Sequence, residues 1–410
     1  MAGIRDRKSK DAKSGNYRAD NVELFSREIK SDTNSSDKIY SRDADNLYPH
    51  RIEKVINNSP TGRRCANLMA KYIAGKGNTS NFKIGKKYIN DIISAASASI
   101  SKQYGVYFRI KYGIDTTRTM ADGDGDVKFN INYTEVLDYV PMAKSKEDDD
   151  DFEGKFYMLK DDDEGGLSGK DDDLKWFYPF NQDPKVIKYQ MLNDCKEKNI
   201  TDPSLEDLIR NYRGQVFYLN LTPEYIYALP LADSVYNDLD TEFRISTYNN
   251  TQTRKGFLGK TLITKYEDAD GDDADEEFDG ELKTWLGSEN SSTVFVVTVP
   301  QSVTVDLDKA FVVNQLKPQF DDKLFESTIK NIRQNIMGAF NNIPEALVFS
   351  GSGALFGTSA QAYTEMKKFY WEQNEYERSQ LEQTLRLFGF DVNILPLVDE
   401  TITPNIDTNA

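Results

Sequence analysis

The chain has 410 residues, of which 38% are hydrophobic, and its net charge is −16. This length allows two or three domains with a sizeable core. No stretch approaches the roughly 18 consecutive apolar residues of a transmembrane helix, and the N-terminus lacks the apolar segment of a secretory signal. Cys65 and Cys195 are far apart in sequence, and we expect free thiols in a reducing compartment, with Cys65 buried.

The acidity of the chain is concentrated in two short runs. Residues 147–173 contain thirteen acids and three lysines, and residues 267–281 contain ten acids and no base. Each run therefore carries −10, so the rest of the chain carries +4. Such blocks repel themselves and stay solvated, and they say little about partners of the remaining chain.

Calcium binding is the alternative explanation for these acids. Asp268, Asp270 and Asp272 match the first three positions of an EF-hand loop, but Asp273 replaces the glycine of its turn and Asp279 its bidentate glutamate. The run 122–126, Asp-Gly-Asp-Gly-Asp, is a second candidate. We expect solvated hairpin tips and no bound metal.

The first half of the chain begins with a polar segment and three helices. Residues 1–44 form a basic arm without an apolar pattern, and a helix follows Asn46-Leu47-Tyr48-Pro49. A second helix ends near Gly75, and a third covers about 89–104. Helical spacing of apolar residues defines these two helices: Cys65, Leu68, Met69, Tyr72 and Ile73, then Ile89, Ile92, Ile93, Ala96, Ile100 and Tyr104.

A run of strands follows, because the apolar period changes to two. Residues 106–112 and 127–133 alternate apolar and polar side chains across a Gly/Asp turn. Segments 136–141, 155–159 and 174–178 continue this pattern, which predicts an antiparallel meander with acidic loops. A short helix near 203–212 and a strand at 215–220 complete this half.

The second half contains long helical patterns. Pro230 opens a helix with Leu231, Val235, Leu239 and Phe243 on one face. Segments 256–264 and 293–305 are β-rich, and a helix is expected over 319–340. After the glycine-rich stretch 351–357, one helix of about 30 residues starts near Thr358, which makes it roughly 45 Å long. Helical spacing gives these two helices their stripes: Phe320, Leu324, Thr328, Ile332, Ile336 and Phe340, then Ala362, Met366, Phe369, Gln373, Tyr376, Leu381, Leu385 and Phe388.

Motifs for catalysis are weak throughout the chain. Its single histidine, His50, would have to serve any Ser-His-Asp or Cys-His site, and zinc sites need more His and Cys. Residues 256–261 end like a phosphate loop, but only two residues separate the glycines. The third glycine of 351–357 comes one residue late for a dinucleotide fingerprint. We expect no enzyme and no cofactor.

Four short segments resemble those of the portal proteins of tailed double-stranded DNA bacteriophages. The segment 340–347, Phe-Asn-Asn-Ile-Pro-Glu-Ala-Leu, is similar to the family's link between stem helix, tunnel loop and wing helix. Tyr227-Ala-Leu-Pro-Leu231 with Gly256-Phe-Leu258 resembles the first stem helix and the clip, and 45–49 the start of the wing. The resemblance spans about residues 45–390. Within this family, the sequence is most similar in overall character to the portal proteins of Bacteroidetes phages, including crAss-like phages. Glu345 departs from the second proline of many relatives. The residues after 390 are too few for a tall helical crown, which is either absent or lies beyond residue 410.

The resemblance implies an α+β portal-type fold. Its parts would be an α/β wing with the antiparallel meander, two stem helices, a small β-containing clip, and a long helix after a tunnel loop. The implied divisions are an N-terminal arm 1–44, wing 45–228, first stem helix 229–251, clip 252–310, second stem helix 311–340, tunnel loop 341–357, long wing helix 358–390 and C-terminal tail 391–410.

The resemblance also implies a function and partners. A homo-oligomeric ring, typically a dodecamer, would sit at the portal vertex of the capsid after assembly in the host cytoplasm. Double-stranded DNA would pass without sequence preference, and the major capsid protein, the terminase motor and tail adaptors would dock, with no membrane involved. The basic arm could contact DNA, the capsid or a scaffold, or remain a disordered tail without a partner.

Site residues follow from the same resemblance. Lys323, Lys330 and Arg333 could form sparse positive rings in the stem, or could be ordinary solvated or inter-subunit pairs. The tunnel-loop candidates are Val348, Phe349, Ser350, Gly351, Ser352, Gly353, Ala354, Leu355, Phe356 and Gly357. The clip candidates for partner docking are Phe257, Leu258, Trp285 and Phe295.

Two other functions stay open. One is a different structural ring or capsid subunit of a virion. The other is a metal-dependent nucleic-acid-processing enzyme, which would need a few carboxylates fixed on strands rather than dozens in solvated runs.

Overall fold

The computed structural model describes most of the chain in eleven segments. These segments are residues 39–43, 45–114, 129–146, 154–161, 166–169, 174–255, 260–267, 294–300, 311–316, 322–349 and 360–397.

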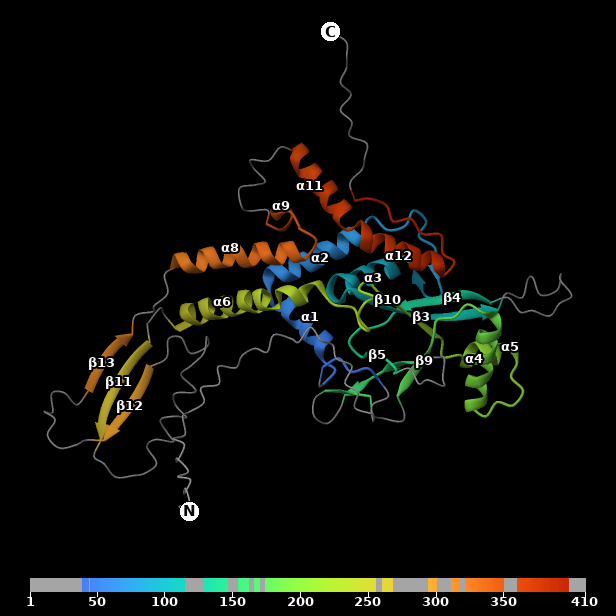
Figure 1. Cartoon of the computed structure of the whole chain (residues 1–410), viewed down its shortest axis with the longest axis horizontal. Helices are drawn as coiled ribbons and strands as arrows, with labels where there is room; N and C mark the ends of the chain where they lie inside the picture. The colour runs from blue at the N-terminus through green and yellow to red at the C-terminus, as the bar shows by residue number, and fades with distance from the viewer. Residues whose placement is uncertain are drawn as a thin grey trace, which may run out of the picture.

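Three helices open the described chain, as the sequence predicts (Figure 1). They are α1 (Tyr48–Asn58), α2 (Pro60–Ala74) and α3 (Ile89–Gln103). Proline in the first turn suits α1 and α2, because that position has no intrahelical partner for an N–H group. Gly75, with φ of 55°, ends α2.

A mixed sheet packs against these helices, and it corrects the predicted antiparallel meander. Its strand order is β4-β3-β10-β9-β6-β5, and β10 lies between β3 and β9 instead of at an edge. β10 runs antiparallel to β3 but parallel to β9, where Gln215 pairs with Tyr178. The strands are β3 (Gly105–Ile114), β4 (Phe129–Val136), β5 (Met142–Lys144), β6 (Phe156–Met158), β9 (Lys175–Pro179) and β10 (Gln215–Asn220). Two separate two-stranded antiparallel sheets accompany this sheet. They are β1 (Lys83–Ile84) with β2 (Lys87–Tyr88), and β7 (Lys160–Asp161) with β8 (Leu167–Ser168).

The parallel pair exists because a helical crossover connects β9 to β10. The crossover consists of α4 (Pro184–Glu197) and α5 (Leu205–Asn211). The sequence predicted α5 but not α4. Two of the residues that α4 buries, Gln190 and Asp194, are polar, so its apolar stripe is interrupted.

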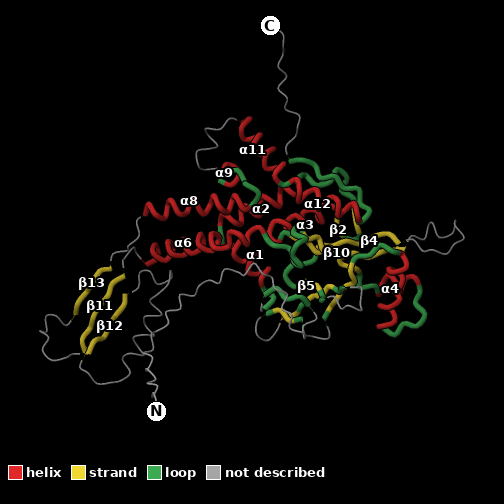
Figure 2. The backbone as a smooth tube through the Cα atoms, viewed as in Figure 1, coloured by secondary structure: helices red, strands yellow, loops and turns green. Residues whose placement is uncertain are grey.

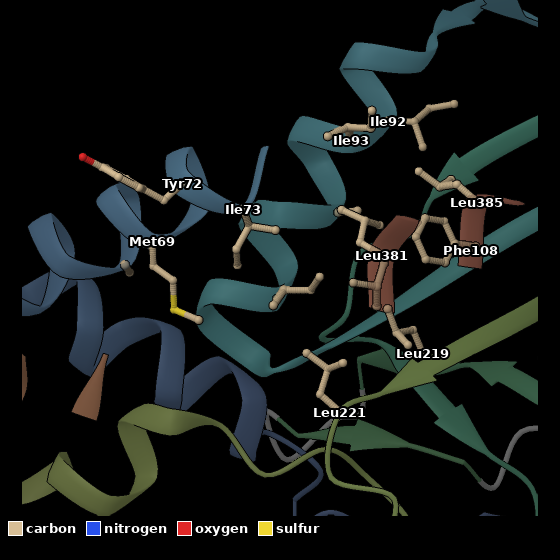
Figure 3. Close-up of a cluster of buried hydrophobic side chains, with 14 of the residues drawn as sticks. Met69, Tyr72, Ile73, Ile92, Ile93, Phe108, Leu219, Leu221, Leu381 and Leu385 are labelled. Carbon is tan, nitrogen blue, oxygen red and sulfur yellow. The ribbon is translucent and has the colours of Figure 1, made fainter. Parts of the chain in front are cut away.

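One hydrophobic core joins the first and last parts of the chain (Figure 3). Ile92 and Ile93 of α3 meet Phe108 of β3, and Leu381 and Leu385 of a C-terminal helix complete the cluster. All five side chains are essentially buried. Two stretches that are far apart in the sequence therefore form one packed body.

Two long helices lie side by side next to this body (Figures 1 and 2). They are α6 (Tyr236–Lys255) and α8 (Asp322–Ala339). Pro230 does not begin α6 directly, because it caps a 3₁₀ turn, η1 (Leu231–Val235), that precedes the helix.

A three-stranded sheet lies beyond the far ends of α6 and α8 (Figure 1). It contains β11 (Lys260–Glu267), β12 (Val294–Pro300) and β13 (Phe311–Leu316), in the order β12-β11-β13. β13 corrects the predicted boundary of the second stem helix at 311, because that helix begins only at Asp322.

The predicted single helix after residue 358 is two helices in the structure. α11 (Ala360–Gln373) and α12 (Glu375–Leu387) meet at Asn374, which has φ of −101° and ψ of 19°. Asn374 is fully buried, and its amide donates to the Tyr370 carbonyl at 2.7 Å. Phe369 and Tyr376, expected on the buried stripe, are 44% and 51% exposed, because the break and the helix register bury Tyr370 instead.

Candidate functional site at the end of the α8 helix

The structure describes side chains for four of the predicted site residues. These are Lys330 and Arg333 on α8, and Val348 and Phe349 after it. Lys323 lies in α8 and Phe295 in β12, where only the backbone is described. The remaining candidates, Phe257, Leu258, Trp285 and residues 350–357, lie outside the described residues.

Val348 belongs to a helix and not to a loop. A short helix, α9 (Glu345–Val348), follows Pro344, and the Val348 side chain is 9% exposed in the main core. The loop predicted over 341–357 therefore needs correction in its first part. Val348 packs in the core of this chain, so its side chain is not exposed for contact with another molecule.

Arg333 is held by contacts within the chain. Its Nε lies 3.6 Å from Oε1 of Glu242 on α6, and its guanidinium carbon lies 4.9 Å from the ring centroid of Phe349. Arg64 of α2 approaches the same ring at 5.6 Å. Cation–π contacts of this kind are worth about 0.5–1 kcal/mol at exposed sites. Phe349 is thus fixed between two guanidinium groups where the chain leaves α9.

Glu242 connects three helices at one buried point. Its carboxylate accepts hydrogen bonds from the Thr61 backbone N–H at 3.1 Å, from the Thr61 hydroxyl at 2.6 Å and from the Ser59 hydroxyl. These donors belong to the first turn of α2, where the helix dipole favours a negative charge. Ser59 also caps that helix by accepting from the Gly62 N–H at 2.9 Å. Glu242 therefore attaches α6 to α2, and its contact with Arg333 adds α8.

Gly62 allows this close approach of α2 and α6. A Cβ atom at this position would overlap the Leu239 side chain and lie 3.1 Å from the Ser59 hydroxyl oxygen. Leu239 is fully buried and has little room to move. The cap signature Ser59-Pro60 is readable in the sequence. Its partner Glu242 is 183 residues away from Ser59, and no local pattern signals that contact.

Two consecutive asparagines end α8. Asn341 and Asn342 have φ of 59° and 53°, in the left-handed region that asparagine tolerates better than most residues. The Ile343 N–H donates to the Met337 carbonyl at 3.0 Å. This bond gives a partner to one of the last carbonyl groups of α8, which have none within the helix. The chain reverses sharply here and turns toward α9.

The Asn341 turn is bonded to the break between α11 and α12. The Asn341 amide donates to Glu377 Oε1 at 3.0 Å and to Asn374 Oδ1 at 3.2 Å. The Tyr370 hydroxyl donates to the Phe340 carbonyl at 3.1 Å, and the Tyr104 hydroxyl donates to Glu377 at 2.9 Å. Burial and the Glu377 charge raise the pKa of Tyr104, so this phenol stays protonated and remains a donor. We call these six residues the Asn341 joint.

Together, these contacts hold the described first part of the predicted tunnel loop. Arg333 and Arg64 contact Phe349, and the Asn341 joint bonds the end of α8 to Asn374 at the C-terminal end of α11. The sequence indicated the glycine-rich stretch but not the joint. Its signal was the Asn341-Asn342 pair, which is unusual at a helix end without glycine.

The exposed face of α8 is mostly polar and uncharged. From Glu326 to Gly338 the described exposed residues include one acid and two bases, and one of those bases, Arg333, is paired with Glu242. The exposed residues of this stretch are Glu326, Ser327, Lys330, Asn331, Arg333, Gln334, Asn335 and Gly338. Such a surface can contact a polyanion with little electrostatic attraction.

Groups that could carry metal or thiol chemistry are scarce in the parts of the chain that the structure describes. No group of three His, Cys, Asp or Glu side chains is placed to hold a metal ion there. Burial and the nearby Glu242 charge raise the pKa of the Cys65 thiol to about 12, and burial raises that of Cys195. The candidate calcium runs 122–126 and 268–279 lie outside the described residues. Among the described helices, none is long and apolar enough to span a membrane.

Solved structures with some similarity to this chain come from gene transfer agent particles. No protein-family profile and no curated protein sequence matches the chain. A chain of the neck of a native gene transfer agent particle, computed with C12 symmetry, overlaps at a TM-score of 0.43 and 13% identity, covering 86% of this chain and 82% of that one. A chain of the native virion gives 0.44 and 12%, with coverages of 87% and 85%.

A third match is a chain of the neck of an empty gene transfer agent particle, computed with C6 symmetry. Its TM-score is 0.40 at 12% identity, with coverages of 84% and 80%. Overlaps this weak establish neither a shared fold nor a function. We therefore base the proposed function on this chain's own residues.

Proposed function

We propose that this protein is the subunit of a ring at one vertex of a viral capsid, through which double-stranded DNA passes. The observation that carries the proposal is the arrangement of α6 and α8. The two helices lie side by side, with a small sheet beyond one end, and α8 turns at the other end through the Asn341 joint toward the glycine-rich segment. This order is that of stem, clip, tunnel loop and wing in a portal protein.

The α8 face supports a passive channel wall. A moving duplex must be held weakly and without sequence preference, and many phosphate contacts would bind it too tightly. Lys330 is an exposed cation on this face, whereas Arg333 is shared with Glu242. In the ring, Lys323 and Lys330 would form sparse positive rings, and residues 350–357 would contact DNA sterically.

The partners follow from the proposed position in the virion. The sheet of β11, β12 and β13 would meet the terminase motor during packaging and tail adaptors afterwards. The wing would contact the major capsid protein, and the ring would contain about twelve copies. The protein would act without catalysis, because its task is to position and guide DNA.

A different structural ring or capsid subunit of the virion is the second candidate. The low charge of the α8 face suits any subunit that surrounds DNA without binding it firmly. A metal-dependent nucleic-acid-processing enzyme is the third, and it would have to use carboxylates outside the described residues.

Electron microscopy of the purified protein in negative stain tests the proposal. We expect closed rings with a central hole as wide as a DNA duplex, and no cleavage of linear DNA when Mg²⁺ or Mn²⁺ is added. Closed shells or sheets without such a hole would favour the capsid-subunit alternative. Metal-dependent cleavage that EDTA abolishes would favour the enzyme and contradict the proposal.

A further inference from the structure

The outer face of α4 carries an unusual stripe of lysines and apolar residues. At about 100° per residue these positions fall within roughly 100° of the helix circumference. Tyr189 is 66% exposed and Leu192 is 40% exposed, which is high for large apolar side chains. The stripe consists of Lys185, Lys188, Tyr189, Leu192 and Lys196, all exposed.

The opposite face of α4 is packed in the core, and the stripe therefore faces away from the protein interior. Ile187, Met191 and Cys195 are buried in the main core. Gln190 accepts hydrogen bonds from the Tyr212 hydroxyl and the Gln215 amide, both at 2.9 Å. Rotating the helix to bury Tyr189 would break these buried bonds and leave their polar groups unsatisfied.

The acids of α4 do not neutralise the stripe. Asp194 accepts from Arg213 Nε at 2.6 Å, and Glu197 also pairs with Arg213. These two acids lie about 120–180° around the helix from the stripe. Within the described residues, no carboxylate lies at ion-pair distance from any of the three stripe lysines. Among the described residues, the stripe therefore presents three lysines without an acidic partner around Tyr189 and Leu192.

We propose that the α4 stripe docks the acidic run 147–153 of a second copy of this chain. That run contains six acids and one phenylalanine, Phe152, so it matches the stripe in both charge and apolar character. The contact would link neighbouring subunits, and it rests on the proposed ring only in supposing that copies lie side by side.

The described residue that follows the run in the same chain, Lys155, lies on the side of α4 away from the stripe. Lys155, which follows the run, lies with its Nζ 4.6 Å from the Trp176 ring centroid, and Arg213 covers that ring at 3.6 Å. Arg213 binds α4 through Asp194 and Glu197, on the side away from the stripe. A second copy is therefore the better source of the acidic run.

A protein partner fits the stripe better than nucleic acid does. DNA binding is dominated by cations that contact phosphates. The stripe instead places an exposed tyrosine and leucine at its centre, and aromatic residues are enriched in protein interfaces.

A charge exchange between two variants tests the inference. The first variant carries Lys185→Glu, Lys188→Glu and Lys196→Glu. The second carries lysine in place of all six acids of the run, Glu147, Asp148, Asp149, Asp150, Asp151 and Glu153, so that the charge of the run changes from −6 to +6. A matched control, Lys54→Glu with Lys86→Glu and Lys87→Glu, changes the net charge as much as the first variant does, at exposed sites away from α4. Mass photometry over a dilution series measures assembly, and circular dichroism confirms that each variant folds.

Each reversed variant alone should need about tenfold more protein for half-assembly than the wild type, because several interfacial charge pairs become repulsive. The equimolar mixture should recover wild-type assembly, since each copy then offers its partner the opposite charge. The control should behave like the wild type.

Several results would overturn the inference. Unchanged assembly of the lysine variant would do so, as would a wild type that never self-associates. Recovery only when both reversals are placed in one chain would show that the run docks within its own subunit. Loss of DNA binding with unchanged assembly would assign the stripe to nucleic acid. Charge-dependent oligomers that are not closed rings would count against the proposed function but not against this contact.

Discussion

At the scale of single residues, Gly62 determines how closely α2 and α6 approach. A Gly62→Ala variant should lose about 1–3 kcal/mol of stability, because its methyl group would overlap the buried Leu239. Gly338→Ala is a matched control, since the nearest atom to its new Cβ, in Asn342, is 3.9 Å away. In α8 that change should instead stabilise the protein by about 0.4–1 kcal/mol. Urea unfolding measures both values, and equal effects of the two variants would contradict the packing described for Gly62.

The two thiols give a second prediction at this scale. Cys65 and Cys195 are fully buried, and the raised pKa of about 12 keeps Cys65 protonated at pH 8. Because only the thiolate reacts rapidly, neither cysteine should react with a thiol reagent in the native protein, and both should react in denaturant. Absorbance of the released chromophore follows the reaction. Rapid modification of Cys65 in the folded chain would show that α2 is less well packed than described.

At the scale of elements, the Asn341 joint fixes α8 relative to α11 and α12. Asn341→Gly keeps the left-handed backbone but removes the amide from buried Glu377, which should cost about 1–3 kcal/mol. Asn341→Ala should cost about 1–2 kcal/mol more, because alanine also strains the left-handed position. Thermal unfolding with calorimetry measures the two losses. If alanine were no worse than glycine, the backbone conformation given for the turn would be wrong.

The same elements show how far the sequence could be interpreted. Apolar spacing predicted α2, α3 and most of α8, because one face of each is apolar. It did not predict the break at Asn374, where the side chain accepts a hydrogen bond from Asn341, 33 residues earlier. The sequence also placed β10 after an antiparallel meander. The parallel pairing of β10 with β9 depends on the crossover helix α4, and α4 was not predicted because its buried face includes the polar residues Gln190 and Asp194. The local apolar pattern thus predicted which segments form helices and strands, whereas long-range contacts determined the helix break and the order of the strands in the sheet.

In the candidate site, too, the sequence predicted local exposure but not long-range contacts. Sequence identified Lys330 as an exposed cation, and the structure agrees. It did not foresee that Arg333 pairs with Glu242 and packs on Phe349, because these residues are brought together from three helices and a turn.

At the scale of the whole molecule, the proposed ring should bind DNA weakly. Each phosphate contact steepens the slope of log affinity against log salt by about 0.9 for duplex DNA. Lys330→Ala should therefore make that slope shallower by about one for each contacting subunit, with no change in sequence preference. Lys54→Ala on α1, at another exposed lysine, is the control and should leave the slope unchanged. Fluorescence anisotropy over a salt series measures both, and an equal effect of the control would place the DNA elsewhere.

The central claim is that α8 and the glycine-rich segment face a shared axis occupied by DNA. A cryo-electron microscopy reconstruction of the assembled protein tests it most directly. We predict a closed ring in which the exposed α8 face around Lys330 and residues 350–357 line the central hole. A ring with these residues on its outer rim, or an assembly without a hole, would contradict the account.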